Sequence, residues 1–139
     1  PIDVTTEDGA TTLRSFLWPD QTHRRHRLDT AIAVARTHGV TVDAADAGAW
    51  AEAQLAAPRP GMATVVYHSI VLQCLPRATF GRLRAAMVGA SEHAPDDAPV
   101  YWLRMEPAGD VADLRLFHRG EDRVLATSGY HGPPITWSG

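Results

Sequence analysis

The sequence predicts an α/β fold with a mostly parallel sheet that ends in an antiparallel hairpin. The first observation is that segments with helical periodicity, at residues 20–38, 47–57 and 76–90, are separated by short apolar runs. The second is the continuous apolar run from Met62 to Tyr67, which is typical of strands covered on both faces. The third is the alternation of apolar and polar residues from Leu114 onward, which indicates an antiparallel hairpin.

The helices are predicted from capping signals as well as from periodicity. Asp8 opens a short amphipathic stretch that Trp18-Pro19 ends. Asp20 stands at the N-cap position of a helix that is expected to end at His38, because Gly39 is a typical C-terminal stop. Two further helices are expected, from Ala47 to Ala57 and from Pro76 to about Ala90.

The strands are predicted between these helices and after them. Val40 to Val42 is short and β-prone, Met62 to Tyr67 forms the buried run, and Val100 to Met105 is mostly apolar. The hairpin is expected to pair the segments on either side of the turn at residues 119–122. Helices that alternate with strands imply right-handed crossovers and therefore parallel neighbours.

Composition limits the kind of protein that this chain belongs to. Its 139 residues suit one domain, and 45% hydrophobic with 21% charged residues is typical of a globular protein. The net charge of −3 argues against a nucleic-acid partner. No apolar run approaches the ~20 residues of a membrane span, no secretory leader is expected, and the single cysteine, Cys74, favours the cytoplasm.

Polar residues follow the predicted parallel strands, where ligands usually bind in open α/β sheets. Asp43 and Asp46 follow the first strand, His68 and Ser69 follow the second, and Glu106 follows the third. A neutral imidazole in this place would serve as a general base, which makes His68 the catalytic candidate. Two structural alternatives stay open: Asp46 caps the next helix, and His68 is a hydrogen-bonded histidine that holds its neighbouring loop.

A metal site is not predicted. The histidines are scattered along the chain and Cys74 stands alone. A run of arginines at positions 24, 25 and 27 is interpreted as a solvated helix face. No glycine-rich loop of a nucleotide-binding type occurs in the chain.

Several blocks of the sequence resemble an uncharacterised bacterial family, the domain of unknown function with number 2332. The most specific block is Leu17 to Thr22, which contains Trp-Pro-Asp-Gln, and the run from Pro1 to Val4 and the segment from Arg27 to Ala33 accompany it. The strand from Val65 to Ser69 and the closing segment from His131 to Trp137 are similar to later blocks of the same family.

The resemblance implies the C-terminal half of a Rossmann-like class I methyltransferase that uses S-adenosylmethionine. It would place His68 near the methyl acceptor, and Asp43 or Asp46 near the adenine. The chain departs from the family pattern in lacking the upstream strands and the glycine-rich segment. The expectation is therefore a single α/β domain over residues 1–139 that is a fragment of a longer chain. S-adenosylmethionine would then bind the full-length parent and not this chain.

Two functions follow from these observations. The first is the C-terminal part of a methyltransferase-like protein that is inactive by itself, and the second is a non-catalytic binding or assembly module. Without the upstream strands, the segment from Ala63 to His68 would present an open apolar edge. A homodimer through that edge, or pairing with the missing N-terminal region, is therefore expected.

Overall fold

The computed structural model describes residues 2–138, so Pro1 and Gly139 lie outside the described residues. Pro1 begins one of the blocks of the family resemblance. Its contacts divide the chain into two compact units, with the boundary between Ala44 and Ala45. We call them the N-terminal unit and the C-terminal unit and describe each by itself.

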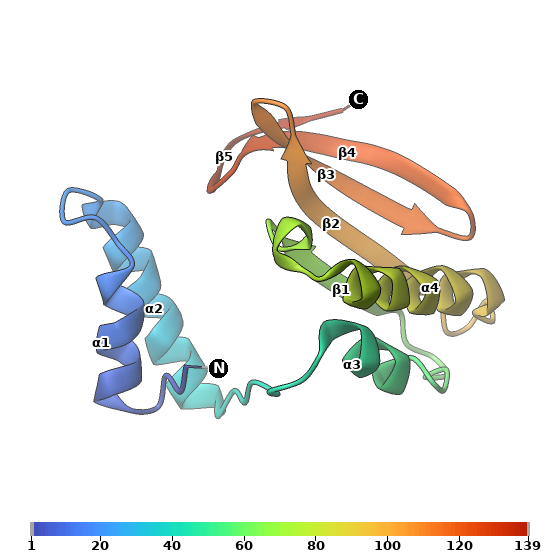
Figure 1. Cartoon of the computed structure of the whole chain (residues 1–139), viewed down its shortest axis with the longest axis horizontal. Helices are drawn as coiled ribbons and strands as arrows, with labels where there is room; N and C mark the ends of the chain where they lie inside the picture. The colour runs from blue at the N-terminus through green and yellow to red at the C-terminus, as the bar shows by residue number, and fades with distance from the viewer. Residues whose placement is uncertain (1, 139) are drawn as a thin grey trace. The chain divides into compact units, whose positions relative to one another are not determined.

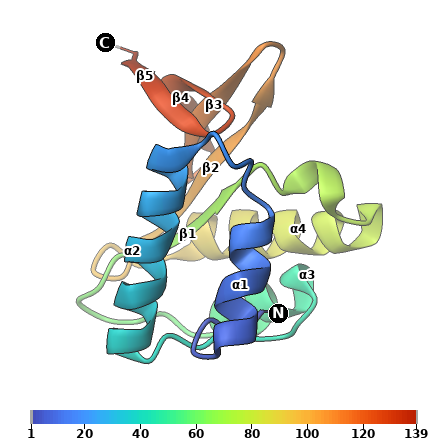
Figure 2. The same cartoon turned by 90° about the vertical axis from the view of Figure 1, so that its left-hand side faces the viewer.

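The N-terminal unit contains two helices, α1 (Glu7–Ser15) and α2 (Thr22–His38), which lie side by side (Figure 2). An ion pair of 2.7 Å between Arg14 of α1 and Asp29 of α2 joins them. The hydroxyl of Thr6 caps α1 by accepting a hydrogen bond from the N–H of Gly9.

Of the two helix ends predicted for α2, one is confirmed and one is wrong. Gly39 ends the helix in the left-handed conformation, with φ of 61°, as predicted. The predicted cap at Asp20 is wrong, because Gln21 occupies the N-cap position and makes no side-chain capping bond. The strand predicted for Val40 to Val42 is also wrong: this segment has no regular secondary structure and no strand beside it to form a ladder.

The C-terminal unit is built on a curled sheet of five strands in the order β1-β2-β3-β4-β5 (Figure 1). Only β1 and β2 are parallel, and every later pair is antiparallel. Irregularities in register after Leu114 and Ser128 accompany the curl. The strands are β1 (Thr64–Ser69), β2 (Val100–Ala108), β3 (Val111–His118), β4 (Glu121–Gly129) and β5 (Gly132–Trp137).

The predicted mostly parallel, Rossmann-like sheet is therefore wrong, and connection length explains why. A parallel neighbour needs a crossover of about a dozen residues or more. Among the described strands only β1 and β2 are joined by such a crossover, which contains α4 (Arg77–His93). Short turns with left-handed glycines, Gly109, Gly120 and Gly132, join the later strands and make them antiparallel.

The prediction that the apolar run before His68 is buried on both faces is also wrong. It forms β1, but β1 lies at the edge of the sheet and alternates between half-buried and exposed residues. Val65 and Tyr67 are 54% and 55% exposed, so one face of β1 is uncovered. An unbroken apolar run is therefore no proof of burial on both faces.

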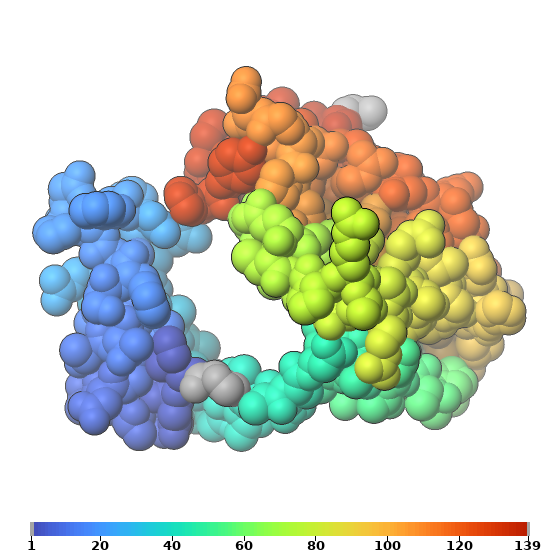
Figure 3. Space-filling model, in the orientation of Figure 1, coloured from blue at the N-terminus to red at the C-terminus, as the bar shows by residue number. Residues whose placement is uncertain are grey.

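Helices α3 (Ala47–Gln54) and α4 confirm two predicted helices, and α4 covers one face of the sheet. They pack on each other, and α4 packs on β2 and β3; Figure 3 shows the side chains of α4 against those of the strands. The core centres on Trp102, which is 1% exposed, and Met87, which is fully buried. The two helices approach closely at Gly48, where a Cβ would lie 2.7 Å from that of Arg82.

Strand β5 was not predicted. Its segment contains Pro133 and Pro134, which reduce the tendency to form a strand because proline has no N–H to donate. The strand forms at the outer edge of the sheet, the place where proline is tolerated.

Candidate functional site

The polar cluster of the C-terminal unit forms between the end of β1 and the middle of β2. Residues on β2 alternate between faces, so Trp102, Arg104 and Glu106 lie on one face. The parallel register sets His68 of β1 beside Arg104, which brings the imidazole between the other two side chains. Two residues predicted from separate strand ends, His68 and Glu106, are thus neighbours in space.

Both ring nitrogens of His68 make hydrogen bonds. Nδ1 lies 2.7 Å from Oε1 of Glu106, and the indole Nε1 of Trp102 lies 2.9 Å from Nε2. Because an indole N–H only donates, Nε2 must accept, which leaves the proton on Nδ1. The imidazole is therefore neutral and donates to the Glu106 carboxylate.

The same carboxylate also holds the chain that follows β1. Backbone N–H groups of Val71 and Leu72 donate to Glu106 Oε1 at 3.1 and 3.4 Å, and Leu72 also reaches Oε2 at 3.3 Å. Ile70, between this loop and the strand, has a left-handed φ of 50°, a conformation that costs a β-branched residue energy. Glu106 thus fixes a strained turn.

Burial favours the neutral form of His68. The side chains of His68 and Glu106 are 12% and 14% exposed. Desolvation lowers the pKa of His68 below its ordinary 6.5, and the positive charge of Arg104 acts in the same direction. The hydrogen bond and charge of Glu106 oppose that shift but do not cancel it, so the neutral form is favoured.

An arginine network borders the cluster on the same face. The guanidinium of Arg104 lies 4.5 Å from the centre of the Trp102 ring and donates at 2.6 Å to both carboxylate oxygens of Asp122. Burial alone would raise the pKa of Asp122, but Arg104 and Arg115 hold that pKa below its ordinary value. These ion pairs extend the polar face of the sheet from β2 to β4.

The remaining predicted site residues lie elsewhere. Asp46 caps α3 by accepting from the N–H of Ala49 at 3.0 Å, so the capping alternative is confirmed, and it also accepts from the Thr79 hydroxyl of α4 at 2.5 Å. The Thr79 hydrogen bond is the main cause of its lowered pKa. Ser69 is exposed and lies on the opposite face of β1 from His68, while Asp43 is an exposed residue of the N-terminal unit.

Trp102 and Arg104 were missed as members of the cluster. A signal was present in Trp102 itself, because a buried indole N–H needs an acceptor. Placing the Trp102 indole beside His68 requires the register of β1 on β2, which does not follow from the sequence alone.

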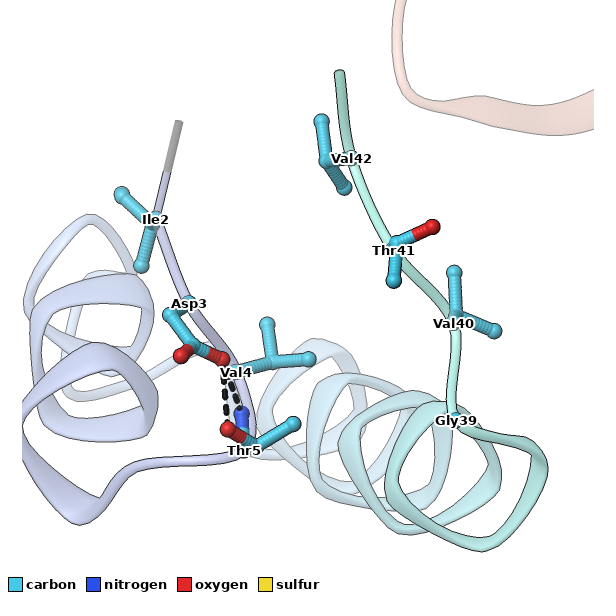
Figure 4. A pocket seen from close by; sticks show the side chains of 8 residues that line it. All are labelled: Ile2, Asp3, Val4, Thr5, Gly39, Val40, Thr41 and Val42. Atoms are coloured by element: carbon cyan, nitrogen blue, oxygen red, sulfur yellow. Dashed lines mark hydrogen bonds between the residues drawn. The ribbon is translucent and has the colours of Figure 1, made fainter. Parts of the chain in front are cut away.

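A separate pocket lies within the N-terminal unit, between residues 2–5 and 39–42 (Figure 4). Its volume is ≈ 370 Å³, and β-branched side chains line much of it. The carboxylate of Asp3 lies on its wall, where it accepts hydrogen bonds from the N–H and the hydroxyl of Thr5. Among residues 2–138, no group of three or more potential ligands is arranged to hold a metal.

The C-terminal unit also has an open sheet edge along β1. The N–H of Thr64 donates to the carbonyl of Pro99, directly before β2, and the N–H of Ile70, directly after β1, donates to the carbonyl of Met105 in β2, both at 2.8 Å. Since backbone groups alternate along a strand, those of Val65, Tyr67 and Ser69 point away from β2. No other strand of the described chain pairs with this side of β1.

The mixed sheet and the polar cluster define a small α/β protein whose central polar residues form hydrogen bonds with one another. Within that class, the chain belongs to the family described as "Uncharacterized protein conserved in bacteria (DUF2332)", whose model matches residues 1–137. The predicted family is thereby confirmed. Comparison with curated proteins and with solved structures finds no match. Within the described residues, no helix is long and apolar enough to cross a membrane.

Proposed function

We propose that the C-terminal unit is a non-catalytic assembly module that binds an extended segment along β1. The observation that carries this proposal is the edge of β1, with three residues whose backbone groups are directed outward and with two exposed apolar side chains, Val65 and Tyr67. An added strand would gain main-chain hydrogen bonds at the edge and apolar contact on that face.

The hydrogen bonds within the polar cluster support a structural role for His68 and Glu106. A general base needs a lone pair that faces its substrate. The single lone pair of His68 accepts from the buried indole of Trp102, and Glu106 accepts from His68 and from two N–H groups of the loop. The cluster holds the end of β1 in place, so it keeps the edge strand ordered for a partner. The catalytic role predicted for His68 would require its bond to Trp102 to open.

The proposal is tested with an alternating Val-Thr peptide flanked by lysines, titrated into a dilute, monomeric sample and followed by NMR at the β1 amides. Proline at position 67 removes an outward N–H without touching the bonds to β2. We expect saturable binding by the wild type, and binding by Tyr67→Pro that is about tenfold weaker than by Tyr67→Thr, which loses the same side chain but keeps the outward N–H. Equal binding by wild type and Tyr67→Pro, or no saturable binding by the monomer, would refute the module.

We further propose, as a second candidate, that a longer parent protein binds S-adenosylmethionine and that this chain alone does not. The supporting observation is Asp3 on the wall of the pocket in the N-terminal unit, since a carboxylate is a suitable acceptor for ribose hydroxyls. Asp43 follows the pocket-lining Val42 directly.

Calorimetric titration of S-adenosylmethionine into the parent tests this candidate. We expect binding that Asp3→Ala weakens at least tenfold and that Asp8→Ala, a change at an exposed residue of α1, leaves intact. No heat of binding, or equal affinity in both variants, would remove this candidate and leave the assembly module unaffected.

A further inference from the structure

The partner of the open edge can be identified from the edge itself. We infer that the strand that fills it is β1 of a second copy of this chain, antiparallel to the first across a twofold axis at Val66. This inference rests on the proposed function, because it names the occupant of the same edge.

The backbone of β1 is complementary to itself in this arrangement. A twofold axis at Val66 sets Val65 of one copy opposite Tyr67 of the other, and the reverse. Both residues direct their N–H and C=O groups outward, so the two pairs are of the hydrogen-bonded kind. Val66, whose backbone groups face β2, would lie opposite itself in a pair without hydrogen bonds.

The side chains of β1 favour the same register. Val65 and Tyr67 share the uncovered face, and the axis at Val66 sets two aromatic residues against two β-branched ones, a favourable cross-strand pair. An axis at Tyr67 would instead set Val65 opposite the polar Ser69. The strand Thr64–Ser69 contains no Lys, Arg, Asp, Glu or Pro, the residues that natural proteins use to block an edge.

The opposite edge of the sheet is interrupted by two prolines. Strand β5 carries Pro133 and Pro134, which offer no N–H to an incoming strand. Among the described strands, β1 is therefore the edge strand that offers a second copy a run without proline. A twofold contact uses both open edges at once and leaves the two proline edges outside, so assembly stops at a dimer instead of continuing as a fibre.

Sedimentation equilibrium of the full chain is the first test. We expect a concentration-dependent dimer of twice 15.1 kDa for the wild type and for Ile135→Thr, which alters an exposed apolar residue of β5. Tyr67→Pro should be monomeric at the same concentrations. A wild-type monomer that still binds the Val-Thr peptide would overturn self-pairing but leave the assembly module in place. Open-ended oligomers would overturn the closed dimer.

Cysteine cross-linking tests the register. The exposed Cys74 is first replaced by Ser. In a pair without hydrogen bonds the two Cα atoms lie about 4.5 Å apart, within the range of a disulfide, so Val66→Cys should form a linked dimer on mild oxidation. Tyr67→Cys should form much less, because its opposite residue is Val65. Preferential linkage through Tyr67→Cys, or a dimer that neither position links, would overturn the axis at Val66.

Discussion

The indole N–H of Trp102 donates a hydrogen bond of 2.9 Å to Nε2 of His68, and this bond determines which nitrogen of the neutral imidazole carries the proton. It leaves Nδ1 as the donor to Glu106 and ties β1 to β2 through side chains as well as through the backbone. The exposed edge of β1 is consequently backed by a buried, hydrogen-bonded cluster.

Replacing Glu106 by Gln should destabilise the C-terminal unit. The carboxylate accepts from His68, Val71 and Leu72, whereas an amide keeps one oxygen and turns an N–H₂ group toward donors. We expect a loss of about 1–3 kcal/mol in the free energy of unfolding by urea. The control Glu92→Gln, at an exposed residue of α4, should change that energy by less than about 0.5 kcal/mol. A Glu106→Gln variant as stable as the control would show that the turn needs no carboxylate.

Acidification should weaken the fold through His68. Burial lowers its pKa in the folded protein below the ordinary 6.5, so the unfolded chain binds more protons in the window between the two values. The free energy of unfolding therefore falls as the pH drops below about 6.5, until the folded-state pKa is passed.

The His68→Gln variant isolates this effect, because it removes the titrating group and leaves the other histidines. The stability advantage of the wild type over the variant should shrink as the pH falls, measured by urea unfolding from neutral to mildly acidic pH. A difference that stays constant with pH would mean that His68 titrates alike in the folded and unfolded states.

Substitution of Gly48 should separate α3 from α4. An added Cβ would lie 2.7 Å from the Cβ of Arg82 and 2.9 Å from the carbonyl oxygen of Thr79, so a helix must shift. We expect Gly48→Ala to lower the midpoint of urea unfolding, with a cost of about 1–3 kcal/mol. Gly81→Ala, on an open side of α4, should instead stabilise by up to about 1 kcal/mol. Equal effects of the two substitutions would argue against the close helix contact.

Local signals in the sequence predicted the helices better than the sheet. Gly39 as a helix stop, Asp46 as a cap and the long helix after Pro76 depend on neighbouring residues and are found in the structure. Strand direction depends on connections, and the two-residue turn at Gly109 that reverses β2 into β3 was not recognised. Val40 to Val42 has strand-forming residues but lacks a neighbouring strand to pair with.

The candidate site was predicted in part. His68 and Glu106 were chosen because both end strands, and the parallel register of β1 and β2 does bring them together. Trp102 was not chosen, although it decides the tautomer of His68, because its contribution depends on packing between strands. An open edge at the segment from Ala63 to His68 was expected because the family resemblance implies upstream strands that this chain lacks, and β1 does lie at the edge of the sheet.

The amide exchange rate of Tyr67 tests the pairing of β1 most directly. Its N–H faces the open edge, whereas that of Val66 faces β2 and serves as the internal reference. Measured by NMR over a dilution series, Val66 should remain protected throughout, and Tyr67 should be protected at high protein concentration and lose protection as the dimer dissociates. A Tyr67 amide that exchanges as fast as an unstructured one at every concentration would contradict strand pairing at this edge.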